Sequence, residues 1–297
     1  MPARKEGHVG KWLVSGPPLL YLVVFFAVPT LIMVLASFRT PGEFGGLAPL
    51  VDEAGKLDLN AESYVRFFTE TVYAAVFLKS IVYALVTTFL CLVIAYPLAY
   101  FLALKANPRT RLLLLILVIV PFWTSFLIRT YAWIFILGGK GIPALLASLG
   151  FEDIRLINTP FAVMVGIVYA YLPLMVFPIY VGLEKLDKRL LEASADLYAT
   201  PVGSFLQVTL PLSAPGVVTG CMLVFILLMG EYLIPALLGG GKVFFVGNAL
   251  VDLFLQSRNW PFGAACAVAL VAIMLVTVTL YMRLTLKSGT MRDQSLI

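Results

Sequence analysis

Six long apolar stretches constrain the fold of this chain more than any other feature of its sequence. They lie at about 14–37, 80–104, 112–137, 160–183, 215–238 and 261–282. A helix rising 1.5 Å per residue needs about 20 mostly apolar residues to cross about 30 Å of hydrocarbon. Lipid offers no partner to backbone N–H and C=O groups, so a segment that crosses it in this way must be helical. The sequence therefore predicts an all-α membrane protein with six transmembrane helices.

Composition argues against a water-soluble fold of the same length. Hydrophobic residues make up 61% of the 297 residues and charged residues only 12%, whereas soluble domains carry roughly a quarter charged residues. A single soluble core does not hide that much apolar surface. The first stretch is also longer than the roughly 7–15 apolar residues of a signal peptide, so we expect it to be retained as a span.

The segments between the stretches alternate between a basic side and a neutral side. The tails and the segments 105–111 and 184–196 together carry twelve basic and six acidic residues, whereas the opposite side carries nine of each. Because Lys and Arg are enriched in cytoplasmic loops, we predict that both termini are cytoplasmic. The predicted order is a cytoplasmic tail (1–13), a transmembrane domain (14–284) and a second cytoplasmic tail (285–297).

Two local features refine this outline. Thr159 and Pro160 are suited to the N-cap and the first position of the fourth helix. The outer segment 39–79 contains turn residues followed by a short helix expected at 62–69.

The chain lacks the residues that several kinds of chemistry need. Its only histidine, His8, lies in the N-terminal tail, and its three cysteines lie in apolar runs without metal-ligand spacing. We therefore expect no catalytic residue and no metal site, which argues against an intramembrane hydrolase. The run from Gly239 to Lys242 is followed by Val243, so it does not match a phosphate-binding loop. The basic residues are spread over several loops, which also argues against a nucleic-acid partner.

The loop 184–213 between the fourth and fifth spans carries the most informative pattern. Apolar residues recur along it at spacings of four, three and four: Leu186, Leu190, Ala193 and Leu197. That spacing places them on one helical face. Pro201 then breaks the helix and a second short segment leads into the next span. A unit this short needs a surface to pack against, either lipid headgroups or another protein.

The details of this loop resemble the EAA motif of binding-protein-dependent ABC importer permeases, in which Glu-Ala-Ala leads to a Gly and then to a Leu-Pro pair. Glu192 and Ala193 match, and Ser194 replaces the second Ala. Further residues fall in register: Asp196, Leu197, Ala199, Phe205, Leu210 and Pro211. Tyr198 occupies the Gly position, which puts the turn geometry in question because Gly allows φ values that Tyr tolerates poorly.

The resemblance implies a type I ABC importer permease fold and a cytoplasmic ATPase that docks on this loop. Glu192 would make the polar contact with the ATPase, while Ala193, Ser194 and Ala199 would allow close approach. The implied partners are a homologous second permease, two ATPase subunits that use ATP and Mg, and a periplasmic or lipid-anchored substrate-binding protein. The chain itself would be a pore-forming subunit in the bacterial inner membrane, without enzymatic activity or a cofactor of its own.

Three further stretches, at 121–133, 231–250 and 259–265, are similar to the spermidine/putrescine permease branch of this family. They imply transport of polyamines or of a related small organic solute.

Glu231 is the acidic residue of the fifth apolar stretch. A carboxylate inside a span is costly and commonly faces a cavity, and carboxylates and aromatic faces suit a polycationic polyamine. We therefore predict a substrate pathway formed by Glu231, Tyr232, Trp123, Tyr131 and Tyr171. Alternatively, Glu231 marks the outer end of the helix and pairs with Arg129 or another base, and the aromatic residues serve packing or the membrane interface.

An ion-coupled secondary transporter that works without an ATPase is the alternative function. That class often contains inverted repeats and several intramembrane ionisable groups. The sequence shows no repeat, and Glu231 is nearly alone, so the importer permease is favoured.

Overall fold

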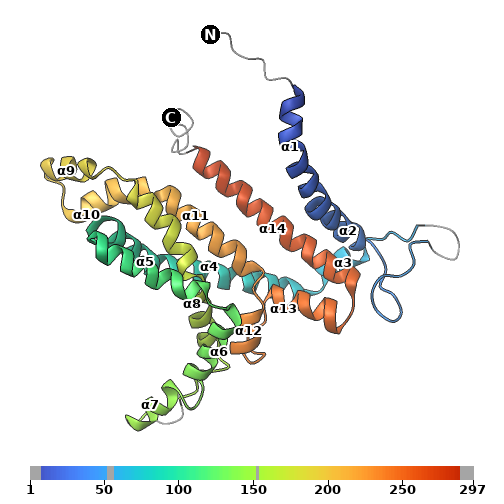
Figure 1. Ribbon diagram of the computed structural model, residues 1–297. Helices are drawn as coiled ribbons and strands as arrows, with labels where there is room; N and C mark the ends of the chain where they lie inside the picture. The colour runs from blue at the N-terminus through green and yellow to red at the C-terminus, as the bar shows by residue number, and fades with distance from the viewer. Residues whose placement is uncertain (1–7, 52–56, 152–153, 288–297) are drawn as a thin grey trace. The chain divides into compact units, whose positions relative to one another are not determined.

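The computed structural model describes residues 8–51, 57–151 and 154–287, and over these ranges it is built from helices and connecting loops (Figure 1). Six of the described helices are long and apolar enough to cross a membrane. They are Ser15–Ala36, Thr71–Lys105, Phe126–Ser148, Pro160–Glu184, Pro201–Met229 and Trp260–Arg283. The predicted all-α fold with six candidate membrane helices is thus confirmed, while most of both predicted tails lies outside the described residues.

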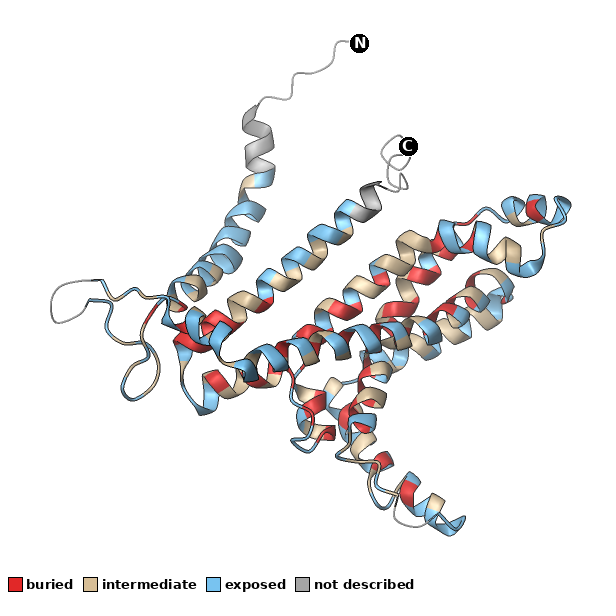
Figure 2. Cartoon of the chain, turned by 180° about the vertical axis from the view of Figure 1, so that it is seen from behind, coloured by how far each residue is buried: buried red, intermediate tan, exposed pale blue. Residues whose placement is uncertain are grey.

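The chain divides into two compact units, Met1–Ala74 with Leu250–Ala272 and Ala75–Ala249 with Ile273–Ile297. The first unit opens with α1 (His8–Leu22), η1 (Val23–Ala27) and α2 (Val28–Ala36), a continuous helix with one π-helical turn. None of residues 15–36 is buried (Figure 2). A helix this apolar and this exposed fits a lipid environment.

The segment that follows α2 in the first unit folds onto its neighbours through polar contacts. Ser37 and Tyr64 join their hydroxyls at 2.7 Å, which ties the end of α2 to α3 (Glu62–Thr69). Helix α3 has the bounds expected from the sequence. Gly46 donates its N–H to the carbonyl of Arg258 at 2.8 Å, just before α14 (Trp260–Lys287) begins.

The second unit holds most of the remaining helices. They are α4 (Thr71–Tyr100), η2 (Phe101–Lys105), α5 (Pro108–Trp123), α6 (Phe126–Leu137), α7 (Ile142–Ser148), α8 (Pro160–Glu184), α9 (Lys188–Asp196), α10 (Pro201–Ser204), η3 (Phe205–Thr209), α11 (Leu210–Met229), α12 (Leu233–Leu238) and most of α13 (Val246–Val251), whereas η4 (Asp252–Gln256) belongs to the first unit. Helix α8 begins as predicted, since the Thr159 hydroxyl accepts the Ala162 N–H at 3.2 Å.

Helices α8 and α11 form the most extensive interface of the second unit and run side by side in Figure 1. Two glycines four residues apart make the close approach possible. A Cβ on Gly216 would lie 2.4 Å from the Pro178 carbonyl oxygen, and one on Gly220 would lie 2.9 Å from the Met175 sulfur. Small residues at this spacing are a common device for packing helices in membranes.

Three predicted spans differ from the observed helices. The second span was expected at 80–104, but α4 begins at Thr71 and includes Lys79, whose ammonium lies 6.0 Å from the centre of the Tyr83 ring. A long Lys side chain can remain in a helix at this position because its charged end reaches away along the neighbouring surface.

The third span, expected as one helix at 112–137, is divided into α5 and α6. The backbone adopts an extended conformation at Thr124, whose hydroxyl donates to the Pro121 carbonyl at 2.6 Å. Pro121 lacks an N–H and crowds the preceding turn, which favours a helix end close to it.

The fifth span, expected at 215–238, begins earlier and is broken near its end. Helices α10, η3 and α11 form one rod over Pro201–Met229. The Leu210 N–H donates to the Phe205 carbonyl, five residues back. This wider turn accommodates Pro211, which has no N–H and would crowd a regular α-helical turn.

Candidate functional site

The loop 184–213 leaves α8 and folds into two capped helices. Asp187 accepts the Arg189 N–H at 3.0 Å and so caps α9. Of the predicted apolar stripe, Leu186 is buried before the helix begins, whereas Leu190 and Leu197 are 47% and 82% exposed. The stripe on α9 therefore remains available to a surface outside the described chain.

The turn after α9 requires a left-handed residue, and Tyr198 supplies it with φ at +58°. The Ala199 N–H donates to the Ser194 carbonyl at 3.1 Å and the Tyr198 N–H to the Ala195 carbonyl at 2.9 Å. This pair of bonds is the Schellman motif that usually places Gly at the left-handed position. Tyr198 therefore forms the same turn that Gly forms in the resembled motif, at a cost of about 1–2 kcal/mol in backbone strain.

The second helix of the loop is held against the first by two serines. Thr200 caps α10 by accepting the Gly203 N–H at 3.1 Å, and the hydroxyls of Ser194 and Ser204 lie 2.7 Å apart. Ser194 is buried, so it faces the inside of the loop. The resemblance implied that Ser194 allows close approach of a partner, and that role stays a prediction, while its hydroxyl contacts Ser204 within the loop.

The other matched residues of α9 point away from this internal contact. Glu192, Ala193, Asp196 and Leu197 are exposed, and Ala199 is half-buried. Within the described residues Glu192 has no hydrogen bond or ion pair. An unpaired carboxylate beside small and apolar side chains is suited to a specific contact with another protein. Leu210 and Pro211 are exposed at the start of α11.

Sequence reasoning missed three contacts between this loop and the helices around it. Arg111, on α5, and Tyr180, on α8, both contact Glu184 Oε1, at 3.3 and 2.7 Å. Phe205 packs edge-on against Tyr96, with ring centres 5.6 Å apart. The local pattern did not point to Arg111 or Tyr96, which lie far from their partners in the sequence, whereas Tyr180 lies one helical turn before Glu184. The Thr200 cap could have been found, because a Thr before a Pro also begins α8.

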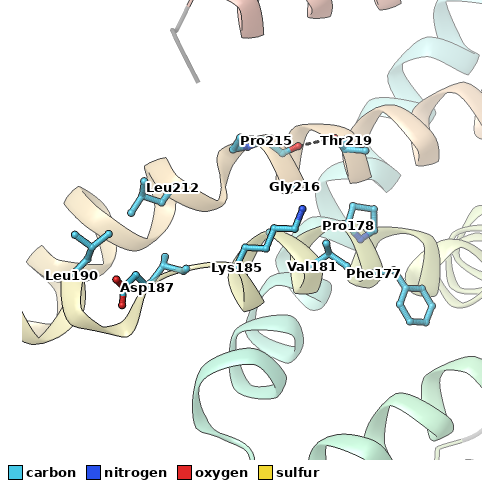
Figure 3. A pocket seen from close by; sticks show the side chains of 12 residues that line it. Phe177, Pro178, Val181, Lys185, Asp187, Leu190, Leu212, Pro215, Gly216 and Thr219 are labelled. Carbon is cyan, nitrogen blue, oxygen red and sulfur yellow. Dashed lines mark hydrogen bonds between the residues drawn. The ribbon is translucent and has the colours of Figure 1, made fainter. Parts of the chain in front are cut away.

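A groove of about 710 Å³ runs between α8, α9 and α11 (Figure 3). Its walls are mainly apolar, with Val181 and Leu190 among them, and the Lys185 ammonium extends into it toward Gly216. Lys185 and Asp187, one basic and one acidic residue, both line the groove next to the loop.

Glu231 lies in the break between α11 and α12, so its predicted place inside a continuous fifth helix is wrong. Its Oε1 accepts the N–H groups of Leu233 and Ile234 at 2.8 and 3.1 Å, which caps α12. Its Oε2 accepts the hydroxyl of Tyr171 on α8. The side chain is 7% exposed. A carboxylate at a helix N-terminus is stabilised by the helix dipole and by these donors, which explains how a buried charge is accommodated here.

The other three residues predicted to form the substrate pathway are exposed. Tyr232 is 45% exposed, and its carbonyl accepts the Asn248 side-chain N–H at 2.8 Å. Trp123 and Tyr131 are 82% and 58% exposed. The structure thus brings Tyr171 to Glu231 and shows no contact that joins Trp123 or Tyr131 to this pair within the described residues.

Within the described residues no ion pair joins Glu231 to Arg129, the partner expected in the alternative interpretation. The guanidinium of Arg129 lies over two rings, 5.8 Å from the centre of Phe122 and 5.7 Å from that of Phe126. The groups that satisfy Glu231 are therefore a Tyr hydroxyl and two backbone N–H groups.

Comparisons with known proteins identify the family of this chain. A family described as binding-protein-dependent transport system inner membrane component matches residues 95–286. The chain is 40% identical over 266 residues to the spermidine/putrescine transport system permease protein PotB of Haemophilus influenzae, covering 89% of this chain and 90% of that protein. It is 41% identical over 266 residues to PotB of Escherichia coli K12, covering 89% and 93%.

Among solved structures, the fold is similar to one chain of a bacterial alginate ABC transporter in complex with an alginate pentasaccharide-bound periplasmic protein. The TM-score is 0.70 at 13% identity, and the match covers 91% of this chain and 92% of that chain. At this identity the likeness concerns the fold.

Proposed function

Because this chain belongs to the family of binding-protein-dependent transport system inner membrane components, we propose that it is the permease subunit of an ATP-driven importer for polyamines of the spermidine and putrescine class. The observation that carries the substrate class is the identity of 40–41% to polyamine permeases over 89% of the chain. The chain is a multi-pass protein of the bacterial inner membrane.

The energy for transport would come from partner ATPase subunits, which hold ATP and Mg, and the loop 184–213 would dock on them from the cytoplasmic side. Three observations support this role. The two helices of the loop are capped and tied together, Glu192 is unpaired in the described chain, and the apolar stripe of α9 is exposed. A rigid loop with one charged contact can transmit the movement of a partner ATPase to the pore.

A homologous second permease and a substrate-binding protein would complete the assembly. The solved structure with the similar fold is a transporter bound to a periplasmic protein, which supports the second of these partners. The excess of basic residues on one side supports a cytoplasmic location for both termini and for the loop 184–213.

Glu231 would guide the cationic substrate by its charge. A carboxylate has about four acceptor sites, and three of them are used by Tyr171, Leu233 and Ile234. One site remains for a substrate ammonium. Exposed aromatic faces on Tyr232, Tyr131 and Trp123 would then contact the polyamine along its way.

Reconstitution in proteoliposomes tests the proposal. The chain, its second permease, the ATPase and the binding protein from the same cluster of genes are combined, and uptake of radiolabelled spermidine is followed. We expect uptake that requires ATP and the binding protein. Uptake by the purified chain alone, driven by an ion gradient without ATP, would overturn the proposal in favour of a secondary transporter.

A further inference from the structure

The inner end of α4 contacts the loop 184–213 through an aromatic cluster. Phe205, a residue in register with the resembled motif, packs edge-on against two rings of α4. Its ring centre lies 5.6 Å from that of Tyr96 and 6.1 Å from that of Tyr100, at interplanar angles of 89° and 72°. Edge-to-face packing of this kind is directional, so a movement of Phe205 changes its contact with α4.

A buried hydrogen bond adds a second link between the same elements. The Tyr96 hydroxyl lies 2.9 Å from the Ser213 hydroxyl on α11. Ser213 in turn donates to the Leu210 carbonyl at 3.1 Å, so Tyr96 is the donor of the pair. Tyr96 is 9% exposed and Ser213 is fully buried. The chain of bonds runs from α4 to Leu210, which is itself a residue of the motif.

Two π-helical turns lie next to this link. On α4, η2 follows immediately after Tyr100, and on the other side η3 contains Phe205. A π-helical turn inside a helix is often found at functional sites, where the chain changes its helical geometry. The link therefore joins two helices that each have a π-helical turn next to it.

We propose that Tyr96 is a positioning residue of the transport reaction, which passes movement of the loop 184–213 to α4 through Phe205 and Ser213. This inference rests on the proposed function. Helices α10, η3 and α11 form one rod, so a push on the loop moves Phe205 and Ser213 together. Both residues contact Tyr96, which lies on a different membrane helix.

Substitution of Tyr96 in the complete reconstituted transporter tests this role. Y96F keeps the ring and removes the hydroxyl that bonds to Ser213. We expect binding-protein-stimulated ATP hydrolysis to continue while the amount of polyamine transported per ATP falls about fivefold, at the lower end of couplings between distant sites. S213A removes the same bond from the other side and should give the same fall.

Two further variants distinguish a loss of coupling through Tyr96 from general damage to the protein. In the double variant Y96F/S213A the loss should equal that of either single variant, because the two residues share one interaction. Y100F is the matched control. It keeps a ring that packs on Phe205 and removes a hydroxyl without a hydrogen bond in the described chain, so its transport per ATP should stay at the wild-type value.

Several results would contradict the inference. An unchanged ratio of transport to ATP hydrolysis in Y96F overturns the inference, and so does an equal fall in Y100F. A parallel fall of both rates at a constant ratio assigns Tyr96 a merely structural role and also overturns it. If the wild-type assembly itself does not transport polyamine, the proposed function fails first, before any variant is compared.

Discussion

The Ser194 hydroxyl on α9 lies 2.7 Å from the Ser204 hydroxyl on α10. This contact closes the two short helices of the loop 184–213 across the left-handed turn at Tyr198. Ser194 also donates to the Leu191 carbonyl at 2.8 Å, so Ser204 is the donor of the pair. The loop is thereby held in one shape before any partner binds, and a preformed surface loses less entropy on docking.

Replacing Ser194 with Ala should loosen this loop without unfolding the protein. The resembled motif has Ala at this position, so the smaller side chain fits, but the Ser204 hydroxyl loses its partner. We expect a loss of about 1 kcal/mol in local stability. Hydrogen exchange in the peptides over 188–204 measures it, and S204A should give a similar increase in exchange. S148A, on the distant helix α7, should leave exchange in these peptides unchanged.

Replacing Tyr198 with Gly should stabilise the turn after α9. Gly adopts the observed φ of +58° without the steric cost that an L side chain bears, and we expect a gain of about 1 kcal/mol. Slower hydrogen exchange over 188–204 is the measurement. Y198A removes the same exposed ring and keeps the strain, so equal exchange in the two variants would show that backbone strain is not the cause.

Hydropathy predicted the six membrane helices because the need for about 20 apolar residues is a property of the lipid and not of tertiary contacts. It failed inside the apolar runs. A window of that length does not register a break of two or three residues, such as those at Thr124 and Gly230. These breaks depend on the missing N–H of Pro121 and on the side chain of Glu231.

The candidate sites could be predicted only in part, because the partners of a side chain depend on tertiary contacts. Periodicity placed Ala193 and Leu197 on one face of a helix, but it does not tell what covers each face. Ser194 proved to face Ser204, which lies beyond a turn. Glu231 was identified by its charge alone, whereas its partner Tyr171 is sixty residues away in the sequence.

Substitutions of Glu231 should separate its structural role from its charge. E231A removes the cap of α12 and leaves the buried Ile234 N–H and its neighbour without an acceptor. We expect a loss of about 2 kcal/mol, seen as a lower unfolding temperature of the purified protein. E231Q keeps an acceptor oxygen, so its unfolding temperature should stay closer to that of the wild type.

Polyamine uptake then reports on the charge of Glu231. If the carboxylate attracts the cationic substrate, E231Q should transport spermidine severalfold more slowly despite its near-normal stability. Y171F, which removes a donor and keeps the charge, is the matched comparison and should reduce uptake less. If E231Q takes up spermidine at the wild-type rate, the role of Glu231 is limited to capping α12.

Removing the side chain of Glu192 should disconnect the permease from ATP hydrolysis. Glu192 is exposed and forms no hydrogen bond or ion pair in the described chain, so E192A should insert and remain as stable as the wild type, within about 0.5 kcal/mol. In the reconstituted assembly we expect the substrate-dependent stimulation of ATP hydrolysis to be lost, because the docking contact with the ATPase is gone. E43A provides the control, since it removes an exposed carboxylate from a segment predicted to lie on the opposite side of the membrane and should leave stimulation intact. If E192A retains full stimulation, the loop 184–213 does not dock through this residue, and the ATPase must be bound by another part of the chain.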